Sequence, residues 1–505
     1  MQSYSFHESL AKWKASYKLL VGAVNSFRDA SDDLLQTIPQ SHTSHINRLW
    51  LEETLSQIRE ETSSLDLIEG KIAHSRVDIH RAINASTTLA PVNILPLEML
   101  SRVFTFIPLT LYYARGFHKS LKEHPLVVVS SVCARWRKLA IGTRSLWSYI
   151  YMEEDFVSDK LNSHAHRWVE IWLDRSAGAP LTLNFYKDPS STRQVEGRRI
   201  TSFLQPHINK AAALGFSQSS SYVVEAVLTL YGSQNVSTSL KELSVVFVQP
   251  FTTAKLTWPV TALQGLHKLV LWGLPMTIHP DMDVIAQILL NNPRLHTLHI
   301  QQSTSIFENN NLPMASLPHL KRLTLHLEDN VGLGKQLSML EPGAEELDVT
   351  LTLSHPLDLK SSHKIRTFFE RAKVTRLSLD RLSADHAAQL CTYLDSTPCL
   401  RELSLSCMRK NDSIGLSALL VTSDDGEALA RCPSLRSLVL SRMSIDQEQL
   451  KWAINTYRLS SIELGREVTF QNGPSGVTSG KDFLNWLRRR VDIVTSVGID
   501  NAKNS

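Results

Sequence analysis

The sequence predicts an α/β fold in three parts: an N-terminal helical hairpin, a small all-α module, and a long array of alternating strands and helices. Three observations predict it. Apolar residues follow a heptad spacing in the N-terminal region, two short amphipathic helical patterns follow them, and the pattern Leu-x-x-Leu-x-Leu then recurs from Leu240 onward. We expect the hairpin at 1–86, the all-α module at 87–152, connecting helices with a first repeat-like strand at 153–238, the array at 239–479, and a capping helix and tail at 480–505.

Composition excludes several classes of protein. A hydrophobic content of 43% and a charged content of 20% are ordinary for a soluble protein, and a net charge of +4 is too small to indicate a nucleic-acid partner. No apolar run approaches the roughly 20 residues that span a bilayer, so no membrane partner is expected. The five cysteines form no Cys-x-x-Cys pair. We therefore expect reduced, mostly buried thiols and a cytoplasmic or nuclear location.

Two long heptad patterns make up the N-terminal region. The first contains Phe6, Leu10, Trp13, Tyr17, Leu20, Val24 and Phe27, and Pro39 is expected to end its helix. The second helix is expected from about His45 to Asn84, with Leu51, Ile58, Leu65, Ile72 and Ile79 seven residues apart. Leu55 and Ile83 belong to a second row of heptad positions on this helix, which Thr62, Glu69 and Arg76 interrupt. We therefore favour an antiparallel hairpin over a long parallel dimer.

Two shorter helical patterns follow between Ile94 and Met152. Pro96 suits the first helical position, and Leu100, Val103, Phe104 and Ile107 then form one apolar face. A second stripe contains Val128, Val132, Trp136 and Leu139. Helices this short cannot bury all of this apolar surface against each other, so we expect some of it to bind another protein.

These residues resemble the F-box family. Leu95, Pro96 and Glu98 match its opening Leu-Pro-x-Glu; Val132, Cys133 and Trp136 match its Val-Cys-x-x-Trp; and Leu146 and Trp147 match its final Leu-Trp pair. The connection 108–124 is longer than is usual in the family. The resemblance implies a Skp-type adaptor as partner and, through it, a cullin. It assigns adaptor binding to Leu95, Pro96, Glu98, Leu100, Val103, Phe104, Val132 and Trp136. Of these, we expect Leu95, Pro96, Val103 and Phe104 to be partly exposed; the alternative is an ordinary three-helix core.

The connecting region begins with a helix over 166–176 and a strand over 180–185. Two further helices are expected at 199–214 and 223–231, on either side of the serine-rich segment 217–221.

Nine copies of the leucine pattern then determine the architecture. They begin at Leu240, Leu266, Leu295, Leu320, Ala344, Val374, Leu400, Leu435 and Leu459, so successive starts are 24 to 35 residues apart. Amphipathic helices lie between them, for example at 283–291, 386–394 and 447–457. A strand and a helix in each unit predict an irregular leucine-rich-repeat solenoid. Phe483, Trp486, Leu487 and Val491 are expected to form the buried stripe of a helix over 482–491 that caps the array.

Strand positions between the leucines are expected to face a partner. The densest such patch contains Trp272, His299, Arg322 and His326, which we assign to target binding; the alternative is that they are ordinary solvated strand residues. We find no catalytic constellation, no metal-ligand spacing and no cofactor motif.

The function expected from these parts is that of a non-catalytic substrate-recognition subunit. The F-box would dock the adaptor of a Skp–cullin–F-box ubiquitin ligase, and the solenoid would bind a target protein of unknown identity. The alternative from another class is a leucine-rich-repeat scaffold that binds partners and has no role in ubiquitin ligation. A hydrolase or nuclease has less support, because the necessary carboxylate and histidine constellations are not found.

Overall fold

The structure is a computed structural model with two compact units, 1–138 and 139–505. It describes residues 2–40, 48–86, 88, 91–107, 125–154, 164–187, 197–233, 240–247, 256–275, 278–302, 312–327, 330–353, 359–383, 386–408, 416–422, 428–471, 480–491 and 493–496. No helix in this described part of the chain has both the length and the apolar character of a membrane span.

The first unit is helical. It contains the long helices α1 (Gln2–Gln40) and α2 (Arg48–Ala85), the 3-10 turn η2 (Pro91–Ile94), and the short helices α3 (Leu97–Thr105) and α5 (Pro125–Val132). Helix α6 (Ala134–Gly142) begins in this unit and continues into the second. Both predicted N-terminal helices are present, although α1 continues past Pro39 by one residue.

The heptad seams of α1 and α2 are not buried against each other. On α1, Trp13, Tyr17, Val24 and Phe27 are each about half exposed, and on α2 Ile72 and Ile79 are exposed as well. Trp13 stacks on Tyr17, one turn along the same helix, with ring centroids 5.5 Å apart. The packed hairpin that we expect from the sequence is therefore not formed by the described side chains.

The second unit is built on an open, parallel sheet of 13 strands, in which chain neighbours are also sheet neighbours. Its strands are β1 (Tyr149–Glu153), β2 (Leu181–Tyr186), β3 (Ala211–Ser217), β4 (Glu242–Val246), β5 (Lys268–Trp272), β6 (Thr297–Gln302), β8 (Arg322–Leu327), β10 (Leu347–Leu353), β11 (Val374–Leu382), β12 (Glu402–Cys407), β15 (Ser437–Ser441), β17 (Ser461–Leu464) and β19 (Ile493–Ser496). The chain is thus a mixed α/β protein with helices at its N-terminus.

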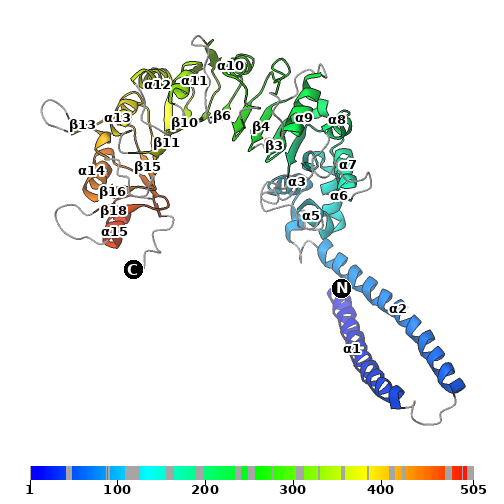
Figure 1. Cartoon of the computed structure of the whole chain (residues 1–505). Helices are drawn as coiled ribbons and strands as arrows, with labels where there is room; N and C mark the ends of the chain where they lie inside the picture. The colour runs from blue at the N-terminus through cyan, green and yellow to red at the C-terminus, as the bar shows by residue number, and fades with distance from the viewer. Residues whose placement is uncertain are drawn as a thin grey trace. The chain divides into compact units, whose positions relative to one another are not determined.

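Helices lie between most successive strands of this sheet, although the described residues contain none between β4 and β5 or between β6 and β8. They are α7 (His164–Ser176), α8 (Gly197–Leu204), α9 (Ser221–Ser233), α10 (Met282–Leu290), α11 (Asn330–Ser338), α12 (Leu359–Arg371), α13 (Ala387–Asp395), α14 (Gln447–Tyr457) and α15 (Gly480–Arg490), with the 3-10 turns η4 (Arg144–Leu146), η6 (Ile208–Lys210) and η8 (Leu416–Leu419). Figure 1 shows α9 to α13 along one face of the sheet.

The repeated leucines form the core between sheet and helices. Leu269 of β5 pairs with Leu298 of β6, and Leu298 pairs with Leu323 of β8, so equivalent positions form a continuous row across the strands. All three leucine-pattern positions are buried in every copy except the one that begins at Ala344, where Ala344 itself is exposed. The alternating apolar residues of each strand therefore pack beside the equivalent residues of the neighbouring strands.

A buried asparagine links two successive copies of the leucine pattern. The Asn292 side chain is fully buried after α10; its Oδ1 accepts a hydrogen bond from the Leu266 amide (2.6 Å), and its Nδ2 donates to the carbonyls of Leu263 (2.8 Å) and Ile288 (2.6 Å). These bonds satisfy backbone groups that would otherwise be buried without partners.

The expected helix over 199–214 is wrong in its second half. Helix α8 ends at Leu204, just before Pro206, and residues 211–217 form strand β3 between β2 and β4. Gly215 explains why this strand fits, because a Cβ there would lie 2.1 Å from Oδ1 of Asn184 on β2. Two more sheet strands, β1 and β19, also lie where no strand is expected from the sequence.

Small strands outside the main sheet lie in some of the intervals between successive copies of the leucine pattern. The longest interval between copies, from Leu400 to Leu435, contains β13 (Leu420–Thr422) and β14 (Ala428–Ala430), which pair antiparallel with each other. The flanking strands β12 and β15 still pair directly, with Leu403 opposite Leu438. Two other small pairs are β7 (Ala315–Leu317) with β9 (Leu340–Pro342) and β16 (Ser444–Asp446) with β18 (Thr469–Gln471).

Helix α15 and Val491, which directly follows it, show most of the expected buried stripe. Phe483, Leu487 and Val491 are buried, while Trp486 is half-buried and stacks on Phe483 with ring centroids 5.7 Å apart. Strand β19 follows the helix and pairs with β17.

Candidate functional site

A small core holds α3 to the segment that contains α5 and the start of α6. Leu100, Phe104 and Leu126 are buried, and the Trp136 ring lies 5.1 Å from that of Phe104. The Trp136 indole N–H also donates to Oδ1 of Asn93 at 3.3 Å. Trp136 is thus a packing residue that joins α6 to α3 and η2.

The residues that the F-box resemblance assigns to the adaptor divide into two groups. Pro96, Glu98, Val103 and Val132 are exposed, and Leu95 and Trp136 are half-buried. Leu100 and Phe104 are 0% and 2% exposed. The expectation that Phe104 is partly exposed is therefore wrong, because its ring fills the space between α3 and Trp136.

Apolar side chains remain on the outside of this core. Leu97, Val128 and Val132 are exposed. We use the term apolar patch for Met99, Val103 and Phe106 of the α3 region, which are exposed as well. Met99, Val103 and Phe106 follow one another at steps of four and three, so they share one side of α3. Sequence reasoning missed Leu97, Met99 and Phe106 as exposed residues, although the spacing from Met99 to Val103 is visible in the sequence.

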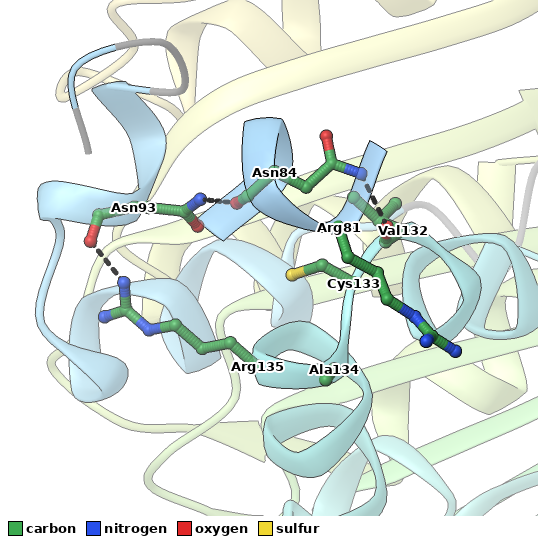
Figure 2. Close-up of a pocket in the computed structure, with 7 residues that line it drawn as sticks. All are labelled: Arg81, Asn84, Asn93, Val132, Cys133, Ala134 and Arg135. Atoms are coloured by element: carbon green, nitrogen blue, oxygen red, sulfur yellow. Dashed lines mark hydrogen bonds between the residues drawn. The ribbon is translucent and has the colours of Figure 1, made fainter. Parts of the chain in front are cut away.

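A cavity of about 290 Å³ lies between the last turn of α2 and the start of α6. Figure 2 shows its lining residues, Arg81, Asn84, Asn93, Val132, Cys133, Ala134 and Arg135. Asn84 donates to the Val132 carbonyl at 3.2 Å, Asn93 donates to the Asn84 carbonyl, and Arg135 donates to the carbonyls of Asn93 and Leu95, the latter at 2.7 Å. These bonds tie the end of α2 to the small helices.

The Leu146–Trp147 pair belongs to the second unit. Trp147 is fully buried, its indole N–H donates to the Ala140 carbonyl at 2.7 Å, and its ring lies 5.9 Å from that of Trp172 on α7. The Arg175 guanidinium lies over the same ring at 4.4 Å. The pair therefore packs in the interior of the second unit.

The four residues assigned to target binding lie on β5, β6 and β8. The rings of Trp272 and His326 are 5.7 Å apart, although His326 is only 6% exposed. His299 is half-buried, and Arg322 is exposed. Burial lowers the pKa of His299, and the positive charges of Lys268 and Arg322 lower it further. His299 is thus held neutral to a lower pH than an ordinary histidine.

Charge alternates along the same face of the sheet. Lys268 lies 3.5 Å from Glu242, and Arg376 lies 3.3 Å from Asp348 and 3.4 Å from Glu402. These pairs are solvent-exposed, so each contributes little to stability.

Sequence reasoning missed an aromatic cluster at the first strands. The rings of Tyr151 on β1 and Tyr186 on β2 are 6.2 Å apart, and burial, the largest cause, raises the pKa of Tyr151 to about 12. Tyr186 shares a strand register with Trp272 through Ser217 and Val246. The signal was hidden because β1 was not expected as a strand.

No group of three or more potential metal-ligating side chains gathers among the described residues. Cys407 and Cys432 are buried, Cys133 and Cys391 are half-buried, and Cys399 is exposed, so burial of the thiols is only partial. Burial raises the pKa of Cys432 to about 12, and its thiol donates to the Leu394 carbonyl, which marks it as a packing residue.

Comparison of the sequence with protein-family models gives no match, and comparison with curated protein sequences gives none.

Proposed function

We propose that the chain is the substrate-recognition subunit of a Skp–cullin–F-box ubiquitin ligase. The observation that carries the proposal is the apolar patch, which is exposed over a core already filled by Leu100, Phe104 and Trp136. Exposed apolar side chains that share one side of a short helix are typical of a protein-binding surface. The Leu-Pro-x-Glu and Val-Cys-x-x-Trp residues lie in the same small module, which favours a Skp-type adaptor as the partner.

The sheet and its helices are proposed to be one leucine-rich-repeat solenoid that holds the target. Support comes from the in-register rows of buried leucines and from the alternation of strand and helix in most of the copies. Trp272, His299 and Arg322 would anchor the target, and the buried His326 would support the Trp272 ring. The protein's contribution to ubiquitin transfer would then be proximity, with the chemistry supplied by other subunits.

Pull-down of the purified chain with a purified Skp-type adaptor tests the proposal. The double change Val103→Glu/Phe106→Glu puts two charges into the apolar patch without touching the core beneath it, and we expect it to abolish adaptor binding. Leu95→Ala/Pro96→Ala should also weaken binding. The matched control is Leu67→Glu/Val77→Glu, which places the same charges at exposed apolar positions of α2.

Undiminished adaptor binding by Val103→Glu/Phe106→Glu would contradict the assignment of the patch. An unmodified chain that fails to bind the adaptor would leave the scaffold function as the better description, because the repeat surface needs no ligase to bind partners.

A further inference from the structure

Helix α1 carries an apolar seam that the described part of the chain leaves exposed. Trp13, Tyr17, Val24 and Phe27 are 49%, 56%, 54% and 55% exposed, although they lie at the a and d positions of consecutive heptads. Such positions are normally buried by a facing helix, and leaving large apolar side chains in water is unfavourable. The seam therefore needs a partner helix.

The charges of the two long helices disfavour α2 of the same chain as that partner. The first half of α1 is basic, with Lys12, Lys14 and Lys18 against Glu8, and its second half is acidic, with Asp29, Asp32 and Asp33 against Arg28. The first half of α2 is acidic, with Glu52, Glu53, Glu60, Glu61 and Asp66 against Arg48 and Arg59. An intramolecular antiparallel pair would bring the two acidic halves together, and like charges across a helix pair are unfavourable.

A second copy of α1 in antiparallel orientation removes this conflict. Each basic half would then lie beside the acidic half of the other copy. The seam positions also match in size: Leu20 would meet Val24, Tyr17 would meet Phe27, and Trp13 would meet Ser31, a large residue opposite a small one. Leu10 would meet Leu34 at either end, so the same seam closes on itself about a twofold axis.

We propose that the chain forms a homodimer through antiparallel pairing of α1 with α1 of a second copy. The seam supplies the affinity, and the opposite charges of the two halves select the antiparallel orientation. Helix α2 is the poorer partner, because Thr62, Glu69 and Arg76 interrupt its own seam. The inference rests on α1 alone and does not depend on the proposed ligase function.

Light scattering of the full chain during size-exclusion chromatography tests the seam. One chain has a mass of 56.8 kDa. We expect the unmodified protein to have twice this mass and to dissociate on dilution. Tyr17→Glu/Val24→Glu should yield the single-chain mass. The matched control is Leu19→Glu/Ser26→Glu, two residues further along and off the seam, which should remain dimeric. A single-chain mass for the unmodified chain at every concentration overturns the proposal, as does a dimer that survives Tyr17→Glu/Val24→Glu.

Charge reversal tests the orientation. Changing Asp29, Asp32 and Asp33 to Lys should dissociate the antiparallel dimer, and adding Lys12→Glu, Lys14→Glu and Lys18→Glu should restore it. A parallel α1 dimer would respond to neither change, since like charges face each other in both forms. An intramolecular pair would be strengthened by the first change and would remain a single chain throughout. Either of these two results overturns the antiparallel dimer.

Discussion

At the scale of single residues, Glu154 shows how burial controls a charge. It follows β1 and is 1% exposed, and its Oε1 accepts a hydrogen bond from the Ser220 amide at 2.7 Å. Burial raises the pKa of Glu154, and this outweighs the opposing effects of hydrogen bonds from Ser220 and Ser219 and of the Lys187 charge. The folded state therefore favours the protonated carboxyl more than the unfolded chain does.

This predicts a pH-dependent effect of Glu154→Gln. Because the folded pKa lies above the unfolded value near 4.5, the carboxyl's contribution to stability is complete below that value and is lost as pH rises through the folded pKa. The neutral amide does not titrate. We expect the unfolding free energy of Glu154→Gln, relative to the unmodified chain, to increase between about pH 4 and pH 8. Thermal melts across that range measure it, with Glu463→Gln on the exposed side of β17 as control; a constant difference would contradict the burial argument.

Asn292 gives a second residue-scale prediction. Asn292→Ala leaves the Leu266 amide and the Leu263 carbonyl buried without their side-chain partners. Each such orphaned group costs about 1–3 kcal/mol, so we expect a loss of roughly 2–6 kcal/mol in unfolding free energy. Denaturant titration measures this loss, and the neighbouring Asn291→Ala should have a much smaller effect. Equal effects of the two changes would show that the bonds of Asn292 contribute nothing specific.

At the scale of elements, α15 and β19 form the C-terminal end of the sheet. Helix α15 contributes buried Phe483 and Leu487, and β19 covers the edge of β17 that would otherwise be unpaired. An unpaired parallel strand presents free backbone donors and acceptors to other molecules, which promotes aggregation.

Deleting residues 481–505 should therefore cause aggregation or loss of a cooperative melt. Light scattering and circular dichroism during heating measure both outcomes. Deleting only residues 498–505 leaves α15 and β19 in the chain and is expected to leave the melt unchanged. A cooperative melt after the longer deletion would mean that the array does not need this cap.

The helices and strands whose apolar residues follow a regular spacing could be predicted from the sequence. The bounds of α14 agree with the expected 447–457, and the leucines of the nine copies lie in the core because their spacing alone places them on one side of a strand. Strand β3 was missed because its Ala and Gly residues have little strand preference, and its fit depends on Asn184 of the neighbouring strand. The hydrogen bonds of Glu154 and Asn292 join groups 66 and 26 residues apart, and no local pattern contains such contacts. At the candidate site, the helical spacing of α3 was visible, but the choice between Val103 and Phe104 as the outer residue depends on where Trp136 packs.

At the scale of the whole molecule, the two compact units should be functionally separable. The proposed adaptor surface lies in residues 1–138, and the proposed target surface lies in residues 139–505. Trp272→Ala/Arg322→Ala should thus reduce the set of proteins captured by the chain while adaptor binding stays unchanged. Quantitative mass spectrometry of material bound to each variant measures both, and Ser404→Ala/Ser406→Ala is the milder control. Loss of targets in the control, with retention in the Trp272/Arg322 variant, would move the site to the C-terminal repeats.

The β13–β14 hairpin implies that this chain can change length without changing its core. The hairpin occupies the longest interval between copies, yet β12 and β15 on either side of it pair as neighbouring strands do elsewhere. Insertions at such crossovers are therefore nearly neutral for folding, whereas an insertion within a strand would displace a whole row of leucines. Natural variation in repeat length should accumulate at these crossovers, and the junction between β13 and β14 is the position at which to insert an epitope tag or a fluorescent reporter.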